Sequence, residues 1–391
     1  MSPTSFAYRN PTHRLVFGRG ALDRIAEELS AAALRKPMLV CSARGAASDA
    51  ARMIIQALRI GHDAVFSGVR SHAPLASVNE AWKQARALQP DCLIALGGGS
   101  AADTVKGIAL AFAEEGRVLD FVLARGADGQ LKGRPTITPK LPIVAVPTTV
   151  SGAEVSPSFG LTDDSGRKLI IRHDSLAPSI LVYDPDLLRS VPLATLAPSV
   201  MNALAHNVEA LYSKGRNPIS DVYACASLPL LNDGLSTALA DPADDDAYSS
   251  LTLGAYYAAV AIFNARTGLH HAICHKLAPA AGLSHGIANS IILPRALEFN
   301  LPAARPELTR VAQLMCKGPA AAGELRAEHA IEQLEQLSAR AGLPRRLREV
   351  GVRREIFPTL AEKIMSEPGL AFNPRQLRTA REVEEVLEAA W

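Results

Sequence analysis

Histidine is the residue type in this sequence best suited to acid–base or metal chemistry, and several histidines are grouped. Four of the ten lie within 16 residues, at His270, His271, His275 and His285. His271 and His275 share one face of a helix because they are four residues apart, whereas His285 is expected in a turn just beyond. A lone histidine is more often a hydrogen-bonded core or surface group. Four so close together predict a catalytic or metal site.

A second helical segment adds three polar side chains. Asn202, His206 and Glu209 are spaced so that one face of a helix carries all of them. Imidazole nitrogens and carboxylate oxygens bind divalent metals, and they also transfer protons. His206 in an apolar helix therefore strengthens the prediction of a catalytic or metal site, and a core histidine remains the alternative.

A glycine turn follows an apolar run at 91–96 and opens a helix. It consists of Gly97, Gly98, Gly99 and Ser100, with Asp103 in the first helical turn. Glycines let the backbone approach a pyrophosphate, and a helix N-terminus offers free N–H groups. The spacing matches neither G-x-G-x-x-G nor a Walker loop, so a tight turn without a ligand is the alternative. Asp103 is equally well explained as a partner of the helix dipole.

A second turn rich in small hydroxyl side chains supports the same prediction. Thr148, Thr149 and Ser151 follow another apolar run, 141–146. Ligands of open α/β sheets bind at the carboxyl ends of the strands. Two such turns together predict a nucleotide site.

Helices and strands must position these residues, and the two halves of the chain differ in the secondary structure that their sequences predict. Up to residue 187, apolar strand candidates alternate with helical patterns, which predicts a parallel sheet covered on both faces. The strand candidates are 37–41, 63–66, 91–96, 141–146 and 180–183, and the helix candidates are 46–60, 77–88 and 103–113. The segment 124–138 is polar and predicts a loop. From 188 to 391 the spacing is helical, for example at 200–214, 248–265, 308–316, 331–341 and 378–390. We expect a Rossmann-like nucleotide-binding domain at 1–187 and an all-helical domain with the catalytic or metal site at 188–391.

Composition excludes several classes of function. Of 391 residues, 48% are hydrophobic and 20% are charged, with a net charge of +2 and 5% aromatics. Such a balance argues against nucleic-acid binding. The longest apolar stretch, 251–263, is too short to span a bilayer. Five scattered cysteines without a CxxC pair favour a reducing compartment. We expect a cytoplasmic protein that acts on a small molecule.

The motifs together resemble the iron-containing alcohol dehydrogenase family, nearly throughout the chain. They are GGGS-x-x-D-x-x-K from Gly97, PTT-x-x-G-x-E from Pro147, H-x-x-E from His206 and H-x-x-x-H-x9-H-G from His271. The resemblance implies a dehydroquinate synthase-like architecture, with NAD or NADP and often iron or zinc in a cleft between the domains, and a homodimer. It also implies which residues line the cofactor, namely Gly97, Gly98, Gly99, Ser100, Asp103, Thr148, Thr149 and Ser151. Arg44 is one residue that could meet the 2′-phosphate of NADP, so the choice between NAD and NADP stays open.

One position departs from the metal-dependent members of that family, which use one aspartate and three histidines. His206, His271 and His285 match the histidines, but Asn202 stands at the aspartate position. A neutral amide is a weaker ligand than a carboxylate, so the affinity for iron should fall. Three imidazoles can still hold zinc. A site without metal is the other possibility.

The departure also bears on the reaction. The sequences around 201–212 and 268–275, and His72-Ala73-Pro74, resemble the maleylacetate reductase branch, which reduces a conjugated keto-diacid with NAD(P)H during breakdown of aromatic rings. The sequences at 284–289 and 101–103 are more similar to the alcohol dehydrogenases. Three functions are open: a metal-independent reductase, a metal-dependent alcohol dehydrogenase, or a relative that has lost redox activity and acts as a binding protein or non-redox enzyme.

Each of these functions except the last needs a proton-transfer group. His275 is the first candidate and His270 the second. Arg172, Arg266 and Lys276 are candidates for binding substrate carboxylates, with a solvated surface charge as the favoured alternative for each.

Overall fold

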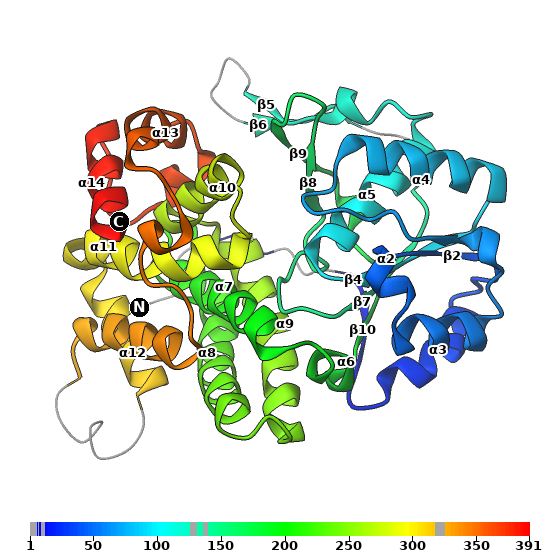
Figure 1. The fold of residues 1–391 in the computed structure, drawn as a ribbon, viewed down its shortest axis with the longest axis horizontal. Coiled ribbons are helices and arrows are strands. Elements are labelled where there is room, and N and C mark those ends of the chain that lie inside the picture. Colours follow the sequence, from blue (N-terminus) through cyan, green and yellow to red (C-terminus); the bar gives the residue numbers. More distant parts are fainter. Residues whose placement is uncertain (1–5, 7, 9–11, 126–130, 136–139, 317–324) are drawn as a thin grey trace. The chain divides into compact units, whose positions relative to one another are not determined.

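The computed structural model describes the chain apart from residues 1–5, 7, 9–11, 126–130, 136–139 and 317–324. The chain forms two compact units, 10–191 and 192–391, and Phe6 and Tyr8 near the start of the chain group with the second. The predicted boundary at residue 187 falls inside α6, Pro185–Arg189, which belongs to the first unit. The predicted fold class is confirmed: a parallel α/β unit is followed by a helical one (Figure 1).

The first unit is built on a six-stranded sheet in which every pair of neighbouring strands is parallel. In spatial order the strands are β1 (Arg14–Phe17), β10 (Ile180–Tyr183), β7 (Ile143–Pro147), β4 (Cys92–Gly97), β2 (Pro37–Val40) and β3 (Val65–Phe66). The central strands are apolar throughout because both faces of the sheet are covered. Side chains alternate between the faces. Met38 and Leu93 share a core with α4 (Leu75–Leu88) and α5 (Gly99–Ala113), whereas Leu39 and Ile94 share one with α1 (Ile25–Ala31) and α3 (Asp49–Leu58).

The sequence-based description of this unit needs four corrections. The edge strand β1 was not predicted, and neither was the antiparallel hairpin of β8 (Ser158–Thr162) and β9 (Lys168–Arg172). The predicted helix 46–60 is α3, which begins later because its N-cap Ser48 accepts the Ala51 N–H, and the short helix α2 (Ala43–Ala46) precedes it. The predicted loop 124–138 contains the short strands β5 (Ala124–Arg125) and β6 (Leu131–Lys132), and its remainder lies partly outside the described residues.

The second unit is helical throughout its described residues. Its main helices are α7 (Leu193–Tyr212), α8 (Pro218–Ala240), α9 (Asp245–Ala265), α10 (Leu269–Ala281), α11 (His285–Met315), α12 (Ala327–Arg340), α13 (Phe357–Ile364) and α14 (Ala380–Ala390). Almost every residue of α7 from Leu196 onward is buried, including the polar Asn202 and Glu209. The helices α7, α8 and α9 pack against one another, and α10 shares a core with α11, α13 and α14.

Local signals explain where the helices of the site begin and end. Gly282, with a φ of 65°, ends α10 in the left-handed conformation that glycine adopts without strain. Ser284 then caps α11 by accepting the Ile287 N–H. The expected turn at His285 is therefore wrong, since His285 is the first residue of α11.

No helix in the part of the chain that the structure describes combines the length and apolarity needed to cross a membrane.

Candidate active site

The helices α7, α10 and α11 bring the predicted histidines together. The ring of His271 stacks on His206, with centroids 4.7 Å apart and an interplanar angle of 15°. It also lies 6.0 Å from the ring of His275 and 6.1 Å from that of His285. The His275 and His285 rings are stacked at 5.8 Å. The clustering inferred from spacing is thus present in space, with His271 at its centre.

The start of α10 is fixed by two buried side chains from elsewhere in the chain. Its N-cap is Gly268, which has no side chain to satisfy the free N–H groups of the first turn. Instead, the Leu269 N–H donates to Asn373 Oδ1 and the His270 N–H donates to Glu209 Oε1, each at 3.0 Å. A Cβ at position 268 would lie 2.8 Å from Asn373 Oδ1, so glycine is required there. Sequence reasoning missed Asn373, because it lies 104 residues from Leu269 and no local pattern connects the two.

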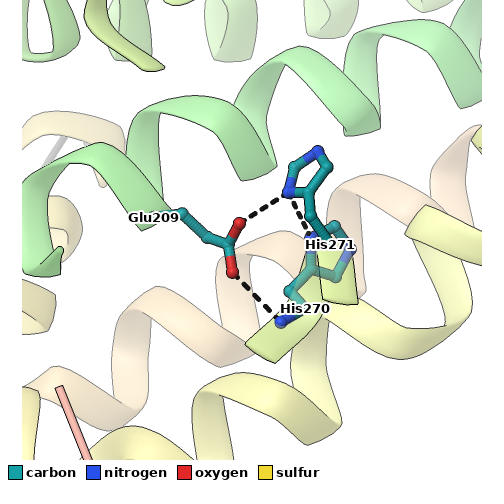
Figure 2. A group of neighbouring side chains, drawn as sticks. All are labelled: Glu209, His270 and His271. Atoms are coloured by element: carbon teal, nitrogen blue, oxygen red, sulfur yellow. Dashed lines mark hydrogen bonds and ion pairs between the residues drawn. The ribbon is translucent and has the colours of Figure 1, made fainter. Parts of the chain in front are cut away.

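Glu209 also orients His271 (Figure 2). Its Oε2 lies 2.6 Å from His271 Nδ1, and both side chains are buried. An imidazole that donates Nδ1–H to a carboxylate presents Nε2 on its opposite side. There, His271 Nε2 lies 3.3 Å from Asn202 Oδ1. Glu209 and Asn202 therefore lie on opposite sides of the His271 ring, one beside each ring nitrogen.

His270 lies behind this arrangement and is fully buried. Its Nε2 is 3.2 Å from the carbonyl oxygen of Asn289, and its Nδ1 is 3.2 Å from His271 Nδ1. Burial, reinforced by His271, lowers the pKa of His270 to about 3, so the ring is neutral at ordinary pH. A neutral ring with both nitrogens in internal contacts is suited to supporting His271.

The residues at the family-type metal position do not fit a divalent metal in this arrangement. Asn202, His206, His271 and His285 provide no negative charge, which weakens the site for iron. The ring nitrogens of His206, His271 and His285 also do not all lie within 4.8 Å of one another, so they do not converge on one point. One observation points the other way: His206 Nδ1 has no hydrogen-bond partner among the described residues, and burial lowers the pKa of His206 well below its usual range.

Among the described His, Cys, Asp and Glu residues, only one group of three or more has its potential ligand atoms within 4.8 Å of one another, and it consists of Glu209, His270 and His271. These atoms are in hydrogen-bond contact, and the 2.6 Å separation of Glu209 Oε2 and His271 Nδ1 is as short as expected for a charge-assisted hydrogen bond. We interpret this group as the hydrogen-bonded support of the site.

His275, one turn along α10, is more exposed than the buried His270 and His271. Its side chain is 29% exposed, and its Nδ1 lies 3.3 Å from Glu367 Oε2. The other oxygen of Glu367 lies 2.6 Å from Lys276 Nζ. Lys276, a candidate for binding a substrate carboxylate, is thus already paired with a carboxylate of the protein. Sequence reasoning did not identify Glu367.

The predicted cofactor residues gather at the carboxyl ends of β4 and β7 in the first unit. The Thr148 N–H donates to the Gly97 carbonyl at 3.1 Å, which holds the two turns side by side. A Cβ on Gly98 would lie 2.8 Å from Thr149 Oγ1, and one on Gly99 would lie 3.4 Å from Ser151 Oγ. The glycines therefore form a close-packed backbone cradle that a side chain would fill. Such a cradle at the N-terminus of α5 suits a pyrophosphate.

Behind the cradle, Asp103 and Lys106 on α5 fix the loop that follows β7. Lys106 is fully buried, and its Nζ donates to the carbonyl oxygens of Ala153 at 2.7 Å and Ser158 at 3.0 Å. Asp103 Oδ2 accepts the Gly160 N–H at 3.2 Å. Burial lowers the pKa of Lys106 to about 8. Asp103, predicted to line the cofactor, is engaged in holding β8 against α5.

Comparison with known proteins gives consistent matches along the chain. Residues 11–185 match the family model described as iron-containing alcohol dehydrogenase, and residues 196–391 match the model of the C-terminal part of that family. The maleylacetate reductase of Burkholderia cepacia is 31% identical over 375 residues, covering 95% of this chain and 94% of that protein. The NAD-dependent methanol dehydrogenase of Bacillus methanolicus is 29% identical over 383 residues, covering 96% and 97%. A solved structure of 1,3-propanediol oxidoreductase has a TM-score of 0.91 at 29% identity, covering 99% of this chain and all of that one.

Proposed function

Because the chain belongs to the iron-containing alcohol dehydrogenase family of oxidoreductases, we propose that it is an NAD(P)H-dependent reductase of a carbonyl or conjugated keto-acid, similar to maleylacetate reductase, and that it works without a metal. The observation that carries this proposal is Asn202. It replaces the expected carboxylate with an amide and lies 3.3 Å from His271 Nε2, the nitrogen that a metal would otherwise take.

The glycine cradle is the proposed binding site for the cofactor. Backbone N–H groups of Gly97, Gly98, Gly99 and Ser100 would meet the pyrophosphate, and Thr148, Thr149 and Ser151 would add hydroxyl groups. The nicotinamide cofactor, when bound, supplies the hydride. The cradle is formed by the backbone, and it therefore selects for the shape of the phosphate group and for its charge.

The histidines have two proposed tasks: to stabilise the negative charge that develops on the substrate oxygen and to deliver a proton. In the absence of a metal, a hydrogen bond from the imidazole of His285, which lies beside His271, would meet the developing charge. His275 would transfer the proton, since its ring is accessible and its Nδ1 is already engaged with Glu367. His270 would support His271 from behind.

A metal-dependent alcohol dehydrogenase is a second candidate. Two observations favour it: His206, His271 and His285 occupy the three histidine positions of the family pattern, and His206 Nδ1 is buried without a partner among the described residues. Zinc held by three imidazoles is a known arrangement in enzymes. The two candidates differ in substrate and in metal requirement.

Steady-state oxidation of NADH and NADPH distinguishes the substrates. The purified protein is assayed with maleylacetate, with simple aldehydes and with ketones. We expect turnover with the conjugated keto-diacid and much weaker turnover with aldehydes. Preferential reduction of aldehydes would support the alcohol dehydrogenase instead, and oxidation of neither cofactor with any substrate would overturn the proposed function.

A further inference from the structure

We propose that Glu367 is a positioning residue for catalysis: it fixes the proton of His275 on Nδ1 and so leaves Nε2 as the atom that exchanges a proton with the substrate. The inference rests on the proposed role of His275. It adds a residue that lies 92 positions away in the sequence, between α13 and the start of the short 3-10 helix Pro368–Phe372.

The contacts of Glu367 support this role. The carboxylate is only 9% exposed, so its oxygens have little access to solvent. Each oxygen has one protein partner, His275 Nδ1 at 3.3 Å and Lys276 Nζ at 2.6 Å. Burial alone would raise the pKa of Glu367, but the hydrogen bonds and charges of His275 and Lys276 outweigh it and lower the pKa to about 2. Glu367 is therefore ionised at neutral pH, and an ionised carboxylate can only accept hydrogen bonds.

The consequence for His275 follows from the two nitrogens of imidazole. In the neutral ring one nitrogen is a donor and the other an acceptor, and the hydrogen bond made by one decides the state of the other. Glu367 accepts from Nδ1–H, so Nε2 is directed away from the carboxylate. The same arrangement recurs one turn earlier, where Glu209 accepts from His271 Nδ1. Two neighbouring histidines of α10 are thus oriented by carboxylates that come from outside the helix.

Lys276 supplies an alternative explanation that the experiment must separate. Glu367 could be retained only to neutralise this lysine, in which case His275 would be indifferent to its loss. The contact of Glu367 with Lys276, at 2.6 Å, is shorter than its contact with His275, at 3.3 Å. The protonation of the His275 ring must therefore be measured directly, in addition to the kinetics.

The test compares Glu367→Met, which keeps the length of the side chain without an acceptor, with Glu367→Asp, Lys276→Met and His275→Ala. The readouts are kcat and KM for NADH oxidation, cofactor binding by fluorescence, and the ¹⁵N shifts of His275 in histidine-labelled protein, assigned by their loss in His275→Ala. Glu307→Gln is a matched control, because Glu307 is a half-buried carboxylate paired with Arg216 on another part of the same unit.

We expect His275→Ala to lower kcat by about 10²- to 10⁴-fold and Glu367→Met to lower it by about 10- to 100-fold, as seen when the partner that orients an imidazole is removed. Cofactor binding should stay unchanged, and Glu367→Asp should recover part of the loss. In Glu367→Met the ¹⁵N shifts should move toward the Nε2–H form. In the His275→Ala background, Glu367→Met should add no further loss, because both changes remove one function.

Three results would overturn the inference. One is unchanged ¹⁵N shifts in Glu367→Met. Another is an equal fall in kcat in Lys276→Met, and the third is an independent fall in the His275→Ala background. If His275→Ala itself keeps full turnover, the proposed role of His275 fails first. If it loses turnover while Glu367→Met does not, only the inference about Glu367 fails.

Discussion

The glycine cradle of the first unit and the histidine cluster of the second are built from different parts of the chain. The cradle is made of backbone and of residues within two short turns, held together by the Thr148 N–H on the Gly97 carbonyl. The histidine cluster is made of side chains whose supports come from far away, such as Glu209 for His271 and Asn373 for Leu269. A site formed by backbone tolerates the loss of a side chain but not the addition of one, whereas a site formed by side chains shows the opposite sensitivity.

The largest expected effect is a loss of stability of the second unit in Glu209→Ala. This change leaves the buried His271 Nδ1 and the His270 N–H without their acceptor. Breaking a buried pair by removing one partner costs about 3–5 kcal/mol. We expect the free energy of unfolding to fall by that amount in urea titrations.

Glu209→Gln is the control for Glu209→Ala, since it keeps one acceptor oxygen for the His270 N–H. It should cost clearly less than the alanine variant. Equal stability of Glu209→Ala and the parent protein would show that the histidine cluster does not depend on this support.

The second prediction concerns acid stability. The pKa of Glu367 is about 2 in the folded protein against an ordinary value of 4.5. A depressed carboxyl pKa stabilises the fold above the unfolded pKa, and this contribution is lost as the pH falls from about 4.5 to about 2. The contribution is on the order of 3 kcal/mol. Glu367→Met should therefore be less stable than the parent near pH 6, with the difference shrinking through this window; a difference independent of pH would contradict the assignment.

The third prediction is that Gly98→Ala, in the first unit, weakens cofactor binding. The added Cβ would lie 2.8 Å from Thr149 Oγ1 and 3.0 Å from Thr149 Cγ2, so the two turns must separate. Overpacking of this kind costs about 1–3 kcal/mol. We expect weaker cofactor binding in isothermal titration, and little change in unfolding free energy of the second unit.

A second substitution tests whether the clash with Thr149 causes the weaker cofactor binding of Gly98→Ala. Thr149→Ala removes both close atoms, so adding Gly98→Ala to Thr149→Ala should cost much less than Gly98→Ala alone. If Gly98→Ala weakened cofactor binding equally with and without Thr149→Ala, the role of Gly98 would not be to let the two turns pack closely.

The contrast between the two sites also explains how much the sequence predicted. The strands β2, β4, β7 and β10 and the turns after β4 and β7 were predicted because their signals are local: apolar runs followed by glycine or hydroxyl residues. The edge strand β1 was missed because only three apolar residues, Leu15 to Phe17, follow the exposed Arg14, and such a run is too short to predict a strand.

The histidines themselves were predicted, but the residues that orient them were only partly found. Glu209 was noticed as a helical neighbour of His206, yet its partner is His271, 62 residues away. Glu367 and Asn373 meet α10 only through the tertiary fold, and spacing along the chain carries no information about such contacts. His285 was expected in a turn because the cap formed by Ser284 was not recognised.

The proposal that the protein works without a metal is tested most directly by measuring turnover together with metal content. The purified protein is treated with a chelator, its iron and zinc are measured, and NADH oxidation with maleylacetate is recorded before treatment, after treatment and after adding each metal back, with Asn202→Asp in parallel. The account predicts that turnover of the parent protein does not depend on bound metal, and that only Asn202→Asp gains metal. Loss of turnover on chelation, with recovery on adding iron or zinc to the parent protein, would contradict it.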